Sequence, residues 1–148
     1  MAEQQPEPLS AECIAAVQRL VEDGFPYWRD NSTDEQRAKG LEEMHKFEND
    51  EAWTANLMEE IKQQFAAADV NNNQRLERAE YAVFITAMKA SSKARGNFED
   101  DRPETVDQAY DAENLATPGV EGVTEADMDR TMMVFMEKFN EMKTAAGL

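Results

Sequence analysis

Apolar residues recur at helical spacing through most of the chain, and no alternating run is long enough to form a sheet. Ser10 belongs to the residue types that cap helices, and the apolar face behind it predicts a first helix. This face consists of Cys13, Ile14, Val17, Leu20 and Val21. Gly24 and Pro26 predict the end of this helix, so residues 25–30 are expected to be irregular.

Capping signals predict the next two helices. Ser32-x-x-Glu35 has the pattern of a capping box and predicts the start of a second helix. Its inward face would consist of Ala38, Leu41 and Met44. Asn49 or Asp50 can start a third helix, which is expected to stop at Asp69. The apolar face of this third helix would be Trp53, Leu57, Met58, Ile61, Phe65 and Ala68.

Three further helices are predicted in the second half of the chain. A helix resumes by Ala79, and residues 91–102 are the best linker candidate because they mix small and charged residues. Pro103 suits the first turn of a fifth helix, and Thr124 with Asp127 can cap a sixth. The inward faces of the fourth and sixth helices would be Tyr81, Phe84, Ile85 and Met88, and Met128, Met132, Phe135, Met136 and Phe139. The pattern therefore predicts an all-α protein.

The charge balance limits the classes of function. The chain has 31 Asp and Glu against 15 Lys and Arg, a formal net charge of -16. Such a surface repels nucleic acid and anionic lipid, whereas metal cations and basic partners remain compatible with it. The five acids between Glu99 and Asp107 are expected to be solvated. Cys13 and His45 are the only cysteine and histidine, which disfavours catalytic triads and histidine-bound metals. We therefore do not expect an enzyme.

The chain offers no signal for a membrane or for export. No apolar run approaches the length of a membrane span, and Met1–Pro6 is polar and acidic, unlike a secretory leader. We therefore expect a cytoplasmic protein.

A 12-residue window between the third and fourth predicted helices has the spacing of a calcium loop. Its positions 1, 3, 5, 7 and 12 are Asp69, Asn71, Asn73, Arg75 and Glu80. Calcium takes six to eight oxygen ligands, which here would be three side-chain oxygens, the carbonyl of Arg75 and both carboxylate oxygens of Glu80. Glu77, at position 9, could bind directly or through water. The simpler alternative is a polar, Asn-rich turn between two helices.

Phe65, the loop from Asp69 to Glu80, and the aromatic residues Tyr81 and Phe84 together resemble an EF-hand of the calmodulin superfamily. The family usually carries Gly at position 6, where the chain turns with positive φ, and here that residue is Gln74. A residue with a side chain costs on the order of 1 kcal/mol there. Because Asn replaces Asp at two positions and Arg75 and Arg78 oppose a cation, we expect a dissociation constant of roughly 10⁻⁶–10⁻⁴ M.

A second, degenerate hand is predicted downstream, because EF-hands bury their apolar faces by pairing. Residues 123–128 repeat the pattern of residues 76–81, but the loop before them is two residues longer. Asn114, Ala116 and Pro118 stand where ligands are expected, and Asp127 is shorter than Glu. Capping of the last helix is explanation enough for Asp127. The resemblance also implies a short strand pairing between Leu76 and Val123.

The resemblance implies a paired EF-hand domain over residues 49–148, with hand 1 at about 53–90 and hand 2 at about 103–142. An N-terminal helical segment, residues 1–48, would precede it. We expect a calcium sensor that binds one Ca²⁺, rotates the helix after the loop, and exposes apolar residues to an amphipathic or basic helix of a partner protein. Those apolar residues would be Phe84, Met88, Met132 and Met136. The alternatives are a structural adaptor with weak or vestigial calcium binding, and a passive calcium buffer.

Overall fold

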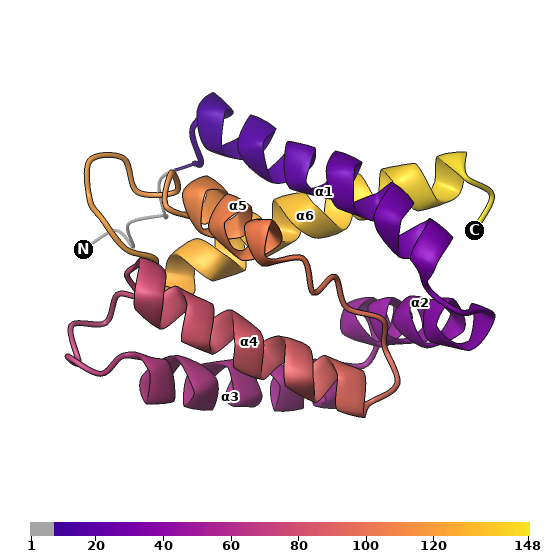
Figure 1. The fold of residues 1–148 in the computed structure, drawn as a ribbon, viewed down its shortest axis with the longest axis horizontal. Coiled ribbons are helices and arrows are strands. Elements are labelled where there is room, and N and C mark those ends of the chain that lie inside the picture. Colours follow the sequence, from indigo (N-terminus) through magenta and orange to yellow (C-terminus); the bar gives the residue numbers. More distant parts are fainter. Residues whose placement is uncertain (1–7) are drawn as a thin grey trace.

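The computed structural model describes residues 8–148 and confirms the all-α prediction over that range. Its helices are α1 (Ala11–Asn31), α2 (Asp34–Asn49), α3 (Glu51–Ala68), α4 (Arg78–Ala94), α5 (Pro103–Glu113) and α6 (Glu125–Ala145) (Figure 1). Extended pairing within residues 8–148 is limited to one β-bridge. None of the described helices is long and apolar enough to cross a bilayer. Met1–Pro6, expected to lack a leader, lies outside the described residues.

The helices pack as neighbouring pairs (Figure 1). Their described side chains form two apolar clusters. α3 packs against α4 and α2, while α1 packs against α6 and α5. The larger cluster joins α3, α4, α5, α6 and the loops between them, and its buried members are Ile61, Phe65, Ala68, Leu76, Tyr81, Phe84, Tyr110, Val123 and Met128. The smaller cluster lies where α1 meets α5, and its buried members are Cys13, Val17, Ala112 and Ala116. The predicted apolar faces of the third, fourth and sixth helices thus supply most of the larger cluster.

The predicted end of the first helix at Gly24 is wrong, because α1 continues through Pro26 to Asn31. Proline removes one backbone donor from the helix interior, which ordinarily breaks or kinks a helix. Aromatic packing stabilises the continuation: the rings of Phe25 and Trp28 each lie 5.2 Å from that of Phe139 on α6. Tertiary contacts with a helix more than 100 residues away therefore override the local signal.

The predicted capping box of the second helix is displaced by one residue. Thr33 caps α2 and forms the reciprocal pair of hydrogen bonds with Gln36. Ser32 instead closes α1, since its N–H donates to the carbonyl of Trp28 (3.1 Å). The predicted inward face is also only partly correct: Ala38 is exposed, and the one buried residue of α2 is Glu43.

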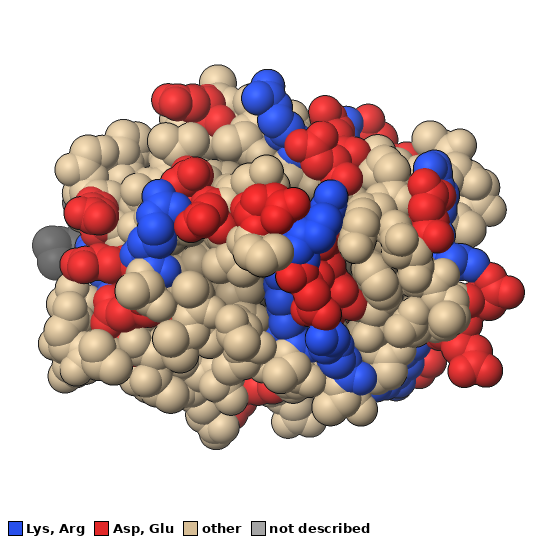
Figure 2. Space-filling model, viewed as in Figure 1, with Lys and Arg blue, Asp and Glu red and all other residues tan. Residues whose placement is uncertain are grey.

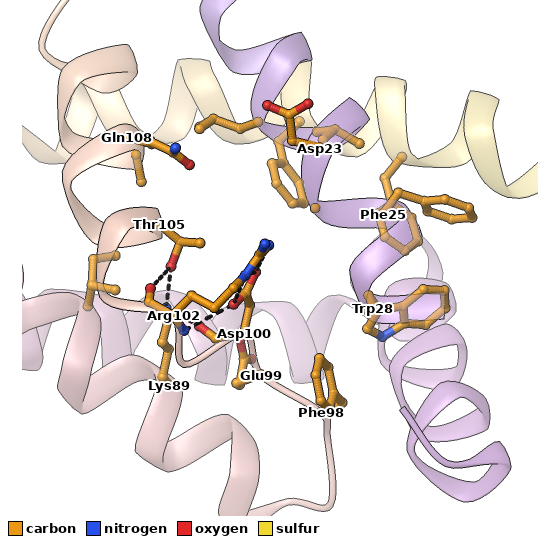
Figure 3. A pocket seen from close by; sticks show the side chains of 17 residues that line it. Asp23, Phe25, Trp28, Lys89, Phe98, Glu99, Asp100, Arg102, Thr105 and Gln108 are labelled. Carbon is orange, nitrogen blue, oxygen red and sulfur yellow. Dashed lines mark hydrogen bonds and ion pairs between the residues drawn. The ribbon is translucent and has the colours of Figure 1, made fainter. Parts of the chain in front are cut away.

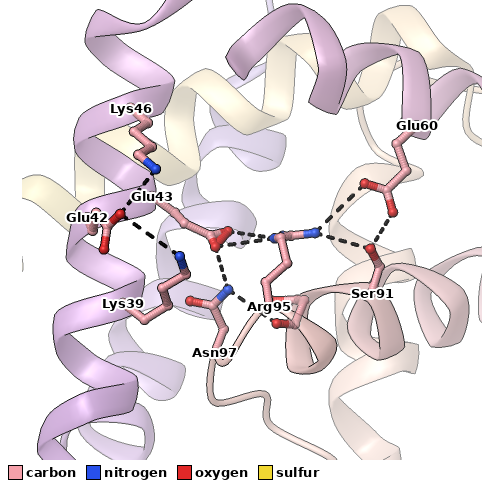
Figure 4. Close-up of polar contacts among 9 residues, drawn as sticks. Lys39, Glu42, Glu43, Lys46, Glu60, Ser91, Arg95 and Asn97 are labelled. Carbon is pink, nitrogen blue, oxygen red and sulfur yellow. Dashed lines mark hydrogen bonds and ion pairs between the residues drawn. The ribbon is translucent and has the colours of Figure 1, made fainter.

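Glu43 is buried, and it accepts hydrogen bonds from residues that directly follow α4 (Figure 4). The Nε atom of Arg95 lies 2.9 and 3.2 Å from the two carboxylate oxygens, and the amide of Asn97 donates to Glu43 at 2.7 Å. Arg95 also donates to the hydroxyl of Ser91 (3.1 Å) and lies 3.8 Å from Glu60 of α3. This cluster, the Arg95 clamp, ties α2, α3 and α4 together.

The predicted linker over residues 91–102 is partly helical and well anchored. α4 runs to Ala94 rather than stopping near residue 90. The ammonium of Lys89 donates to the carbonyl of Asp100 (2.6 Å), and the Asp100 carboxylate pairs with Arg102 at 2.6 Å. The expectation that all the acids here are solvated is wrong for Glu99, since burial raises the pKa of that carboxyl. Charge pairing therefore orders a segment whose composition resembles a flexible linker.

Figure 2 shows acidic and basic side chains next to one another over the face of the molecule that it draws. The surplus of acid is therefore not gathered into one continuous patch on this face.

Candidate metal centre

The candidate site is the loop between α3 and α4, and Asp69 fixes its first turn. The N–H of Asp69 donates to the carbonyl of Phe65 (2.9 Å) and ends α3. Its carboxylate accepts hydrogen bonds from the backbone N–H groups of Asn73 (3.2 Å) and Gln74 (2.9 Å). Only 7% of Asp69 is exposed. Short polar side chains bond to nearby backbone in this way, which explains why Asp, rather than a longer acid, opens the loop.

The two asparagines of the predicted ligand set continue this pattern. The side-chain oxygen of Asn71 accepts from the N–H of Asn73 (3.3 Å), and that of Asn73 accepts from the N–H of Arg75 (3.0 Å). Gln74 has a φ of 66°, so the positive φ predicted at position 6 is confirmed. Asn72 is also left-handed, with φ 54°, and asparagine tolerates this region better than most residues.

Glu80 closes the loop from the first turn of α4. One carboxylate oxygen accepts from the N–H of Val70 (3.0 Å), and the other accepts from the N–H of Glu77 (3.2 Å). The carboxylate therefore reaches across the loop to the residue that follows Asp69. The structure thus brings the acids at both ends of the loop toward the same stretch of backbone.

Both arginines expected to oppose a cation have other partners. The guanidinium of Arg75 donates to the carbonyl of Gly122 in the second loop (3.1 Å). Arg78 pairs with Asp107 (2.9 Å) and Asp111 (2.6 Å) on α5. These contacts direct both positive charges toward the neighbouring helix–loop–helix unit.

The donor chemistry of the loop fits a hard cation. Neither Asp69 nor Glu80 forms an ion pair with any described residue, so two carboxylates at the loop ends have only neutral N–H donors. Asn71 and Asn73 add neutral amide oxygens, as calcium loops use. No group of three or more His, Cys, Asp or Glu within residues 8–148 is placed to hold a metal ion. A cation here would therefore depend on two acids together with amide and carbonyl oxygens.

A backbone bridge joins this loop to the loop between α5 and α6. The amides and carbonyls of Leu76 and Val123 exchange two hydrogen bonds, 2.8 and 2.9 Å, as the resemblance predicted, and both residues are fully buried. Gly122, beside the bridge, has a φ of 102°. A Cβ on Gly122 would lie 3.0 Å from that of Arg75, so the close approach of the loops requires glycine there.

The second loop holds its acid with a cation of its own. Asp127 is 2% exposed, caps α6 by accepting from the N–H of Thr124 (3.0 Å), and accepts from the hydroxyl of Thr117 (2.8 Å). The guanidinium of Arg130 lies 2.6 Å from the same carboxylate and 3.3 Å from the carbonyl of Ala116. Burial raises the pKa of Asp127, but the hydrogen bonds from Thr124, Thr117 and Arg130 outweigh it and hold this pKa below its usual value.

Arg130 was missed at the level of sequence, although its place three residues after Asp127 on one helix face is a usable signal. That the second loop is structural and does not bind metal by itself remains a prediction. Ala116 and Pro118, standing where ligands were expected, carry no side-chain oxygen.

The apolar residues expected to face a partner line cavities between the helices. Phe84, Met88 and Met132 line a cavity of about 300 Å³, whose wall also includes Val17 and Leu20 of α1. A second cavity of about 290 Å³ adjoins it and is lined by the side chains drawn in Figure 3. α1 therefore covers part of the face that the sequence assigned to a partner.

Comparisons with known proteins add no relationship to this geometry: no protein-family model, curated protein or solved structure matches the chain.

Proposed function

We propose that the loop between α3 and α4 binds one Ca²⁺. The ligands would be the side chains of Asp69, Asn71, Asn73 and Glu80 and the carbonyl of Arg75. The observation that carries the proposal is the position of Glu80, which reaches from α4 across the loop to Val70 while lacking a positive partner. Calcium would supply the positive charge that these oxygens lack.

We propose further that this binding is regulatory. Glu80 belongs to α4, so exchanging its bonds from Val70 and Glu77 for a cation would change how α4 is held to the loop. α4 also carries Phe84 and Met88, which line the cavity next to α1. A change at the loop would therefore alter an apolar surface suited to an amphipathic or basic helix of a partner.

The second candidate function is a structural adaptor, and two observations favour it. Arg130 pairs with the acid of the second loop, and the Arg95 clamp holds the far end of α4 to α2 and α3. Both features stabilise a single arrangement of the helices. A passive buffer is less consistent with a single candidate loop in 148 residues.

Calorimetric titration with Ca²⁺ in about 1 mM Mg²⁺ tests the proposal directly. We expect one site with a dissociation constant of roughly 10⁻⁶–10⁻⁴ M. Glu80→Gln should weaken binding by about tenfold or more, because it removes an anionic ligand. Glu104→Gln is the matched control, since Glu104 occupies the first turn of α5 and is exposed. Absence of heat from the native chain at millimolar calcium would overturn the proposal.

A hydrophobic dye separates the sensor from the adaptor. Calcium should increase dye fluorescence with the native chain and leave Glu80→Gln unchanged if the apolar surface responds to the loop. Calcium binding with no change in dye fluorescence would support the adaptor or buffer instead.

A further inference from the structure

The cavity between α1, α4, α5 and α6 has an apolar wall and one carboxyl group held within it. Its volume, about 300 Å³, lies at the lower end of the range for small-molecule sites. Leu20, Phe84, Met88 and Met132 supply much of the apolar wall. The carboxyl is that of Glu113, the last residue of α5.

Two hydroxyl groups hold the Glu113 carboxyl in place. The hydroxyl of Thr131 donates to one oxygen at 2.9 Å, and the phenol of Tyr81 donates to the other. Tyr81 and Thr131 are themselves buried, so neither donor is able to turn freely toward solvent. The carboxyl therefore has a defined position that was not apparent from the sequence pattern.

No positive charge accompanies this carboxyl. Glu113 forms no ion pair with any of residues 8–148, and no Lys, Arg or His lines the cavity. The remaining acidic group on the wall is Asp129, whose side chain is exposed. Burying a carboxylate without a counter-ion is unfavourable, and burial accordingly raises the pKa of Glu113.

We propose that this cavity binds a small molecule with an apolar body and a protonated amine, whose ammonium group pairs with Glu113. The charge of the wall selects the amine: an ammonium supplies the missing cation, whereas a carboxylate would face Glu113 and Asp129. A net charge of -16 also favours the approach of a cation over that of an anion.

The adjoining cavity of about 290 Å³ provides room for an elongated body (Figure 3). Leu20, Ile85, Ala109 and Phe135 line both cavities and so mark the passage between them. Ala109 has the smallest side chain of the four. Its enlargement would narrow this passage while leaving the charge of Glu113 in place.

Three ligands of equal chain length test the proposal: n-octylamine, 1-octanol and octanoate. Each is titrated calorimetrically at pH 7 in EDTA, so the result does not depend on calcium binding. We expect octylamine to bind about tenfold or more tightly than octanol, and octanoate to bind weakest, because only the amine forms a charge-assisted bond with Glu113. Equal affinity for the three ligands would overturn the proposal.

Variants then assign the effect to the cavity. Glu113→Gln keeps the shape and the hydrogen-bonding oxygen, and should abolish the preference for octylamine over octanol. Asp129→Asn removes the same charge from the rim and should change affinity less than about twofold. Ala109→Phe should weaken octylamine and octanol alike. Circular dichroism checks that each variant is folded. If Glu113→Gln and Asp129→Asn reduced the preference for octylamine over octanol equally, the cause would be a general charge effect, and the pairing with Glu113 would be refuted.

Discussion

Gln74 shows the competition between local strain and the closure of the loop. Its positive φ places a side chain where glycine is usual, yet the N–H of Gln74 donates to the buried carboxylate of Asp69. This hydrogen bond fixes the turn that orients Asn73. The resemblance to the family's loop predicted both the turn and its strain, because it implies a positive φ at position 6, where Gln74 stands.

Gln74→Gly should stabilise the protein by about 0.5 kcal/mol. Relief of left-handed strain, about 1 kcal/mol, is partly offset by the greater entropy of glycine in the unfolded chain. Urea unfolding at pH 7 measures the difference. As a control, Gln63→Gly in the exposed face of α3 should destabilise by about 1 kcal/mol, because that residue is helical. If Gln74→Gly lowered the free energy of unfolding, the claim that the positive φ of Gln74 strains the folded protein would be contradicted.

The contribution of Glu113 to the free energy of unfolding should depend on pH in the opposite sense from that of a carboxyl whose pKa is lowered by folding. Burial raises its pKa in the folded protein, so folding favours the protonated form, and ionisation at neutral pH reduces stability. Glu113→Gln should therefore stabilise the protein at pH 7, and this gain should shrink as the pH falls through the raised pKa of the native residue. Urea unfolding between pH 4 and pH 8 checks this. A gain that is independent of pH would rule out ionisation as its cause.

Among the helices, α2 and α3 are joined to the end of α4 by the ion pairs of Arg95 with Glu43 and Glu60. α2 has a weakly apolar inner face, and its one buried side chain, Glu43, accepts from Arg95 and Asn97. The sequence pattern predicted α2 but not what binds it, because an ion pair between residues 52 positions apart leaves no periodic signal. The continuation of α1 through Pro26 was missed for a similar reason, since it depends on Phe139.

Arg95→Met should destabilise the protein by about 2–4 kcal/mol, because Glu43 would remain buried without its positive partner. Lys93→Met is the control on the same turn of α4: Lys93 pairs with Asp101 in an exposed position, and its loss should cost less than about 0.5 kcal/mol. Unfolding midpoints in urea compare the two. If Arg95→Met and Lys93→Met lowered stability equally, the Arg95 clamp would contribute no more than an exposed ion pair.

For the molecule as a whole, charge repulsion and helix packing oppose each other. The excess of 16 negative charges acts against compactness, while α1 packs against α5 and α6 and completes the smaller apolar cluster. Apolar periodicity indicates which residues are buried but not which helix covers which face. The four acidic and amide residues of the candidate loop could be named from their spacing, whereas the role of Glu113 depends on Tyr81 and Thr131, which belong to other helices.

Salt should therefore stabilise the protein. Raising NaCl from about 20 mM to 500 mM shortens the screening length and should increase the melting temperature by about 2–6 °C. Circular dichroism at 222 nm follows the transition. NaCl and choline chloride should act alike, because screening does not distinguish their cations; a rise with only one of them would indicate specific binding.

Arg130 has a consequence for how the paired loops could respond to a dissolved cation. The guanidinium of Arg130 is part of the chain, so a dissolved cation would have to displace it from Asp127 in order to bind there. If calcium binds the first loop alone, as proposed above, its saturation would follow a simple hyperbola with a Hill coefficient of about 1. Moving from one-tenth to nine-tenths occupancy would require about an 80-fold change in free calcium. The protein would thus report calcium gradually over a wide range rather than as a sharp threshold.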